Sequence, residues 1–198
     1  MRRVKVTLPR LPRLLSGMRV VQLTDLHIGP TLGRAWLSQV VARTMALRAD
    51  LVVITGDLVD GSVDRLRDDI APLARLHAAM GVFFVTGNHE YYSGAEAWLG
   101  RVSELGIRPL RNERVSVGPS GNSFDLAGVD DYNAAPMLPS HGPDLPGALA
   151  GRDPGRELLL LAHQPRAIFE ASALGVGLQL SGHTHGGQVL VPGVTAKL

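Results

Sequence analysis

The chain has 198 residues, of which 45% are hydrophobic, so it can bury one sizeable core and a single domain is expected. It contains no cysteine, which excludes disulfides, thiolate zinc sites and a cysteine nucleophile. The formal net charge is only +2 and aromatic residues make up 5%, so a nucleic-acid-binding surface is not expected.

The first 17 residues read as a basic leader, and the domain is predicted to span residues 18–198. Six basic residues and no acidic residue occur among the first 19: Arg2, Arg3, Lys5, Arg10, Arg13 and Arg19. Two interpretations fit this leader equally well: a segment that contacts an anionic membrane surface, or an ordinary solvated N-terminus. No apolar run approaches the roughly 18 residues that cross a bilayer, so the chain as given is expected to be soluble, with the side of any membrane it contacts left open.

Apolar runs alternate with helical patterns along the first half of the chain. Leu51 to Ile54 is a continuous aliphatic run, typical of a strand buried on both faces of a parallel sheet. The pattern predicts strands at 18–23, 51–54 and 82–85, and helices at 33–47, 65–80 and 95–105. This alternation indicates a mainly parallel sheet covered by helices.

The second half changes character. Short strands are predicted at 115–117, 124–129, 158–161, 176–180 and 188–191, with a helix at 166–174, which together suggest a second sheet. Residues 130–147 are rich in proline, glycine and aspartate and are predicted to form a long surface loop, in which His141 is expected to be solvated.

Five of the predicted strands end in side chains that can bind metal ions. These side chains are Asp25 and His27, Asp57, Asn88 and His89, His163, and His183 and His185. One such residue is usually a cap or a core histidine, but five strand ends of one chemical kind indicate a site at the carboxyl edge of a sheet. In Asp25-x-His27 and His183-x-His185, side chains two apart on an extended segment would point to the same side. Carboxylate, imidazole and amide ligands suit two borderline divalent ions such as Mn, Fe or Zn.

These motifs resemble those of the calcineurin-like metallophosphoesterases, whose signature is D-x-H, GD, GNH followed by an acid, a single H, and GH-x-H. The chain shows DLH, GD, GNHE, AH and GHTH in that order, over residues 18 to 191. The fuller wording, TDLHIG, TGNHEYYSG, AGVDD, LLAHQP and SGHTHGGQ, looks most like the bacterial membrane-associated branch of that family.

The resemblance implies an α/β fold, a two-sheet β-sandwich flanked by helices, which here would lack its C-terminal strands and expose an unpaired sheet edge. It implies that Asp25, His27 and His185 hold one metal ion, that Asn88, His163 and His183 hold the other, and that Asp57 bridges both. It also implies hydrolysis of a phosphoester by a hydroxide that bridges the two metals, with Asn88 and His89 at the reacting group. His89 would stabilise the phosphoryl oxygens or protonate the leaving oxygen. Apart from the resemblance, Glu90 is a lesser candidate for orienting a ligand imidazole.

Three functions remain open at this point. The first is a dinuclear phosphoesterase for phosphodiester or lipid-linked phosphate substrates. The second is a phosphomonoesterase or protein phosphatase, although that branch carries two arginines where this chain has Gly61 and Thr86. The third is a non-catalytic binding scaffold on the same fold. The oligomeric state is not indicated by the sequence.

Overall fold

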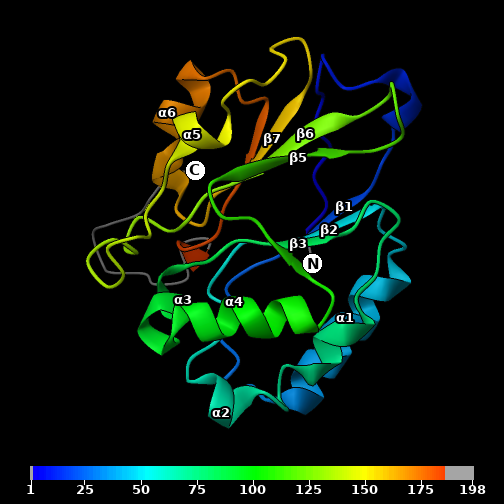
Figure 1. The fold of residues 1–198 in the computed structure, drawn as a ribbon. Helices are drawn as coiled ribbons and strands as arrows, with labels where there is room; N and C mark the ends of the chain where they lie inside the picture. Colours follow the sequence, from blue (N-terminus) through cyan, green and yellow to red (C-terminus); the bar gives the residue numbers. More distant parts are fainter. Residues whose placement is uncertain (1, 186–198) are drawn as a thin grey trace, which may run out of the picture.

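The structure is a computed structural model that describes residues 2–185, and it contains two four-stranded sheets packed face to face (Figure 1). The first sheet is parallel and consists of β1 (Val20–Leu23), β2 (Leu51–Ile54), β3 (Val82–Phe84) and β4 (Arg108–Pro109). The second consists of β5 (Glu113–Val117), β6 (Phe124–Gly128), β7 (Leu158–Leu161) and β8 (Leu178–Leu180). β5 pairs antiparallel with β6, whereas β6, β7 and β8 are parallel.

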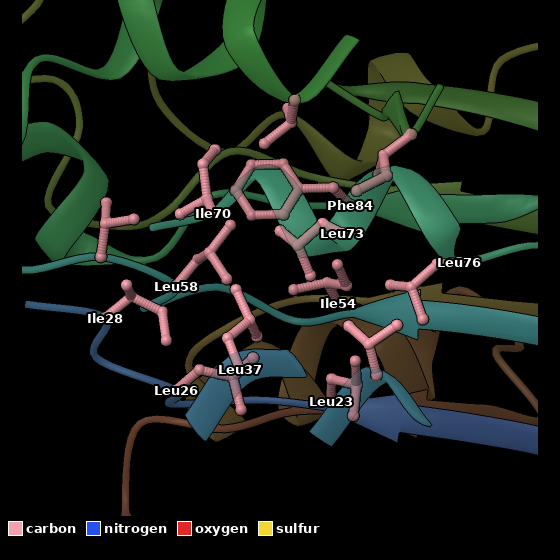
Figure 2. Packing of buried hydrophobic residues seen from close by; sticks show 14 of the residues in the cluster. Leu23, Leu26, Ile28, Leu37, Ile54, Leu58, Ile70, Leu73, Leu76 and Phe84 are labelled. Atoms are coloured by element: carbon pink, nitrogen blue, oxygen red, sulfur yellow. The ribbon is translucent and has the colours of Figure 1, made fainter. Parts of the chain in front are cut away.

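Helices cover the outer face of each sheet, which confirms the predicted sandwich (Figure 1). On the first sheet lie α1 (Arg34–Ala46), α2 (Val63–Leu66), α3 (Asn88–Ser93) and α4 (Ala95–Glu104), and on the second lie α5 (Leu145–Ala148) and α6 (Ile168–Ala173). Within residues 2–185, 3-10 turns occur at Arg13–Leu15, Ala71–Arg75 and Pro165–Ala167. Between the first sheet and its helices, Leu37 of α1 packs in one hydrophobic cluster with Ile54 of β2 and Phe84 of β3 (Figure 2).

Strand β2 explains why one face of its sheet needs helices and the other needs a second sheet. Successive side chains of a strand point to opposite faces. Leu51 and Val53 join the cluster between the two sheets, while Val52 and Ile54 join the cluster under the helices. All four side chains are buried, and each contributes about 1.5–3 kcal/mol to the free energy of unfolding.

The helix predicted at 65–80 is wrong. The segment contains only the single turn of α2 and the 3-10 turn at Ala71–Arg75, because Pro72 lacks an N–H and restricts the residue before it. Leu66, Leu73 and Leu76 are nevertheless buried. The spacing of apolar residues therefore identified core residues correctly, although it was wrong to interpret that spacing as one continuous helix. The loop predicted at 130–147 ends in α5, and α3 was not predicted. The strand predicted at 188–191 lies outside the described residues.

The basic leader contacts the end of the sandwich where β6, β7 and β8 begin. Leu15 is 5% exposed and belongs to the cluster between the sheets. The Arg10 guanidinium donates to the Gly175 carbonyl at 2.7 Å and pairs with the buried Glu157 carboxylate at 3.3 Å, just before β7. Among residues 2–185, no helix combines the length and the apolar character needed to cross a bilayer.

Candidate functional site

All eight side chains predicted at strand ends lie at one edge of the sandwich. Asp25 and His27 follow β1, Asp57 follows β2, Asn88 and His89 follow β3, His163 follows β7, and His183 and His185 follow β8. The carboxyl ends of the parallel strands point the same way in both sheets, so residues as far as 158 apart in the chain meet here.

The first group of converging ligand atoms comes from Asp25, His27 and His185. One atom from each lies within 4.8 Å of the others. The Nε2 atoms of His27 and His185 are 3.1 Å apart, and His185 Nε2 is 3.7 Å from Asp25 Oδ1. The Asp25 Oδ1 atom also accepts the His183 backbone N–H at 2.9 Å, which fixes the chain after β8 against the chain after β1.

The second group comes from Asp57, His163 and His183, again within 4.8 Å. His163 Nε2 lies 3.1 Å from Asp57 Oδ2 and 3.3 Å from His183 Nδ1. The amide oxygen of Asn88 lies 3.0 Å from the same His183 Nδ1. His183 and His185, two residues apart, are therefore divided between the two groups.

Asp57 connects the groups, because its Oδ2 is also 3.9 Å from His27 Nε2. Its side chain is only 3% exposed. Imidazole nitrogens of different residues face one another at hydrogen-bonding distance in this arrangement. Within each such pair of nitrogens, at most one can carry a proton that points toward the other. Imidazole lone pairs that converge beside carboxylates are a donor set that fits divalent transition-metal ions. The described residues thus offer candidate groups for divalent metal ions, and Asp57 belongs both to the second group and to a further one that it forms with His27 and His89.

The backbone is strained at five of these positions. Positive φ angles occur at Asp25 (52°), His27 (45°), Asp57 (50°), His183 (71°) and His185 (49°). Among the described non-glycine residues only Arg48 and Asn112 share this left-handed conformation. The prediction that the segments Asp25-x-His27 and His183-x-His185 are extended is therefore wrong, although their side chains do reach the site. Such strain persists where surrounding contacts impose it, and it gathers at functional sites.

Two glycines make the close approach possible. A Cβ atom at Gly87 would collide with the Asp57 carboxylate and backbone, and one at Gly56 would meet the Gly87 backbone and the His163 ring. Gly56 also has a φ of +88°, which favours glycine. The glycines of the GD and GNH motifs therefore let the turns after β2 and β3 touch.

Glu90 holds these turns in place by accepting hydrogen bonds from the backbone. It is fully buried and accepts from the N–H groups of Asp57 (3.0 Å), Leu58 (2.8 Å) and Gly87 (2.7 Å). The expectation that it orients a ligand imidazole is wrong, because its partners are backbone groups. Burial raises the pKa of Glu90 to about 7, although the Gly87 and Leu58 donors act in the opposite direction.

Asp60 is a site residue that the sequence analysis missed. Its Oδ1 atom lies 2.6 Å from His89 Nδ1 and 2.9 Å from His27 Nδ1. Both rings then carry their Nδ1 proton toward Asp60 and turn Nε2 toward Asp57, at 4.0 Å and 3.9 Å from its Oδ2. A carboxylate that fixes the tautomer and direction of imidazoles is a common outer partner in metal sites. The available signal was its place three residues after Asp57 in the same turn.

His163 and Asp57 each shift the pKa of the other. Burial alone would lower the pKa of His163, but the hydrogen bond and charge of Asp57 raise it to about 9. Burial alone would likewise raise the pKa of Asp57, but the His163 hydrogen bond and charge bring it below the usual value. The metal-free site therefore holds an imidazolium–carboxylate pair at neutral pH.

His141 lies outside this site. Its predicted solvation is wrong, because the residue is 6% exposed. Its Nδ1 is 3.1 Å from the Tyr91 hydroxyl, which ties the loop before α5 to α3. The loop is held further by Asp130, whose carboxylate accepts two hydrogen bonds from Arg111, at 3.0 and 2.7 Å.

Residues 18–187 match the model of a protein family described as "Calcineurin-like phosphoesterase". A curated relative from Bos taurus, a "Transmembrane protein with metallophosphoesterase domain", is 40% identical over 98% of this chain and 46% of its own length. An "Uncharacterized metallophosphoesterase" from Helicobacter pylori is 36% identical over 99% of this chain and 52% of its own length. The chain thus spans about half the length of the curated relatives it matches.

Solved structures with the same fold are more distant in sequence. A 5'-nucleotidase precursor from Thermus thermophilus has a TM-score of 0.55 at 16% identity, covering 85% of this chain and 42% of its own. A putative 5'-nucleotidase from Staphylococcus aureus has a TM-score of 0.56 at 15% identity, covering 85% of this chain and 45% of its own. At these identities the similarity concerns the fold alone.

Proposed function

This chain belongs to the calcineurin-like phosphoesterase family, and from that premise we propose that it is a metal-dependent hydrolase of phosphodiester or lipid-linked phosphate substrates. The observation that carries the proposal is the pair of ligand groups joined by Asp57. Asp25, His27 and His185 would hold one ion, and Asn88, His163 and His183 the other. Bound there, Mn, Fe or Zn ions would neutralise phosphoryl oxygens and lower the pKa of a coordinated water.

The Asp60–His89 pair supports a role for His89 as proton donor. Asp60 Oδ1 lies 2.6 Å from His89 Nδ1 and fixes the direction of the ring, so that Nε2 faces the site. In the proposed reaction water adds its oxygen to phosphorus and releases one proton to solvent, and the P–O bond to the leaving group breaks. The leaving oxygen then takes the Nε2 proton of His89.

The two positions that carry arginines in protein phosphatases support a diester over a monoester. Gly61 uses its carbonyl to accept a hydrogen bond from Trp98 Nε1 at 3.0 Å, and Thr86 is buried with its hydroxyl 3.4 Å from Tyr91. Neither position presents a cation to a phosphate. A monoester dianion needs more positive charge than a singly charged diester, so the diester is the better match.

A substrate screen tests the proposal. The purified chain, reloaded with Mn²⁺, Fe²⁺ or Zn²⁺, is assayed against bis(4-nitrophenyl) phosphate, 4-nitrophenyl phosphate and a phospholipid in micelles. We expect turnover of the diester to exceed that of the monoester. A preference for the monoester would favour the phosphatase alternative. Bound metal without turnover of any substrate would favour the scaffold.

Metal binding is expected to release a proton from His163. The pKa of about 9 means that this imidazole is protonated at pH 7 in the metal-free protein, and a metal ion binds only the neutral ring. Metal affinity should therefore rise with pH, by about tenfold per unit below the pKa for this group. Calorimetric titrations in two buffers of different ionisation enthalpy count the released protons. Binding heats that do not depend on the buffer would contradict the prediction.

Replacing Asp60 with asparagine is expected to lower kcat by about 10- to 100-fold, the usual effect of losing an outer partner of a metal site. The amide loses the negative charge that holds the Nδ1 protons of both His27 and His89. Asp64→Asn, at an exposed acid in α2, is the matched control and should leave kcat unchanged. Equal kcat values for the two variants would show that Asp60 does not position these rings.

The leader is proposed to contact an anionic membrane surface. Val4 and Val6, which lie among Arg2, Arg3 and Lys5, are 67% and 48% exposed. Each basic residue near such a surface contributes roughly 1 kcal/mol to binding, and salt weakens the attraction. Binding to vesicles that contain phosphatidylglycerol should therefore fall as salt is raised, and an Arg2→Gln, Arg3→Gln, Lys5→Gln variant should bind less. Binding that is insensitive to salt, or no binding, would refute this contact.

Within the leader, Arg10 is bound where β7 begins, whereas His163 lies where β7 ends, so Arg10 and the metal groups lie at opposite ends of that strand.

A further inference from the structure

A row of aromatic rings leads from the first ligand group to the protein surface. The His185 and His27 rings are stacked with centroids 5.0 Å apart, and His27 meets His89 edge to face at 4.5 Å. His89 in turn meets Tyr92 at 5.4 Å with an interplanar angle of 62°. Tyr92 is the outermost ring of this row. From the inside outward, the row consists of the proposed metal ligands His185 and His27, the proposed proton donor His89, and Tyr92 at the surface.

Tyr92 differs sharply from its neighbour Tyr91, although both lie on α3. Tyr91 is 6% exposed, and its hydroxyl lies within hydrogen-bonding distance of His141 and Thr86. Tyr92 is 56% exposed. The helix ends one residue later at Ser93, and Gly94, which follows it, has a left-handed φ of 96°, so Tyr92 lies in the last turn of α3. The fold therefore uses one tyrosine for packing and leaves the other at the edge of the site.

We infer that Tyr92 determines specificity for the leaving group, by contacting an aromatic or other planar apolar moiety of the substrate. The inference rests on the proposed function, in which His89 protonates the leaving oxygen. The carbon skeleton attached to that oxygen must lie beside the His89 ring, and the Tyr92 ring is the exposed apolar surface in contact with His89. A tyrosine offers a large face for such a group and keeps its hydroxyl in water.

The chemistry of the contact predicts a selective effect. An aromatic pair contributes about 0.5–1.5 kcal/mol beyond area burial, which corresponds to roughly 2- to 12-fold in affinity. Tyr92 holds no ion and donates no proton in the proposed reaction. Its removal should therefore change the preference among leaving groups and spare metal content.

The experiment compares methyl benzyl phosphate with methyl ethyl phosphate, because benzyl alcohol and ethanol have similar acidity and differ in the ring. We expect wild-type protein to prefer the benzyl ester in kcat/KM, and Tyr92→Ala to reduce this preference by about 3- to 10-fold. Tyr92→Phe should retain it. Leu14→Ala, at an exposed apolar residue of the leader, is the control and should also retain it.

Binding without turnover separates this inference from the proposed function. Calorimetry measures the Kd values of benzylphosphonate and ethylphosphonate with the metal-loaded protein, and their ratio should shrink in Tyr92→Ala alone. If wild-type protein hydrolyses no phosphoester, the proposed function fails, and the Kd ratio still reports on the Tyr92 contact. An unchanged ratio in Tyr92→Ala, or an equal loss for both ligands, overturns the inference.

Discussion

Replacement of Asp57 by alanine is expected to remove both metal ions and to lower phosphodiester hydrolysis by about 10³-fold or more. The carboxylate lies between the two ligand groups, 3.1 Å from His163 and 3.9 Å from His27, and the proposed function makes it the ligand that both ions would share. Two ions provide several kcal/mol of transition-state stabilisation, and each 1.36 kcal/mol is tenfold in rate. Plasma emission spectroscopy measures the metal content, and assays of the same samples measure kcat/KM, so the two measurements together test this prediction.

Asp57→Asn is the informative companion variant. Asparagine has the same size and tolerates the left-handed backbone at φ 50°, so the turn after β2 should be kept while the charge is lost. Circular dichroism should then show a folded protein that binds little metal. Asp68→Ala, at an exposed acid outside the site, should change neither metal content nor rate. Full metal content and full turnover in both Asp57 variants would reject the shared-ligand assignment.

Replacement of His89 by alanine is expected to leave metal content intact and to lower kcat by about 10²- to 10⁴-fold, the range of general acid catalysis. The His89 Nδ1 atom is held by Asp60 at 2.6 Å, and its Nε2 atom lies 4.0 Å from Asp57 Oδ2. The proposed function assigns this ring the role of proton donor, and the variant tests that role against the role of a ligand. Because a good leaving group needs less protonation, the loss should be smaller for 4-nitrophenyl than for ethyl esters.

Comparing the loss of kcat for different leaving groups tests whether His89 acts as a proton donor. His77→Ala, at an exposed histidine that only approaches the Arg75 carbonyl, serves as the control and should retain full activity. A uniform loss for all leaving groups would indicate that His89 positions the phosphate instead. Loss of a metal ion in His89→Ala would place it among the ligands, since His27, Asp57 and His89 also lie within 4.8 Å of one another.

The strand ends could be predicted because two signals coincided. Aliphatic runs such as Leu51–Ile54 identify buried parallel strands, and the residue type just beyond each run does not depend on exact boundaries. The edge at which these residues meet then follows from the parallel arrangement. The failed helix at 65–80 shows the limit of this approach, because Leu66, Leu73 and Leu76 have helical spacing although Pro72 interrupts the helix.

Features that depend on tertiary contact could not be predicted. Asp60 has an ordinary turn sequence, and only the packing of the turn after β2 against α3 shows that it serves two imidazoles. His141 lies among prolines and glycines, yet the Tyr91 hydroxyl makes a buried place for it. The left-handed backbone at His183 and His185 likewise results from contacts with the first sheet, since Asp25 accepts the His183 N–H.

Under the proposed function, the positive φ angles at five site residues would make the stability of the chain depend on metal binding. Each such residue costs roughly 1 kcal/mol or more, and together they claim a large share of the 5–15 kcal/mol that keeps a domain folded. Bound ions would offset this cost, because a ligand that binds only the native state raises its stability with concentration. In a metal-starved cell the chain would unfold more often and be degraded sooner. The amount of protein in the cell would then depend on metal availability. A His185→Gly variant would stabilise the metal-free chain, because glycine favours a positive φ, but it would also lose a proposed ligand.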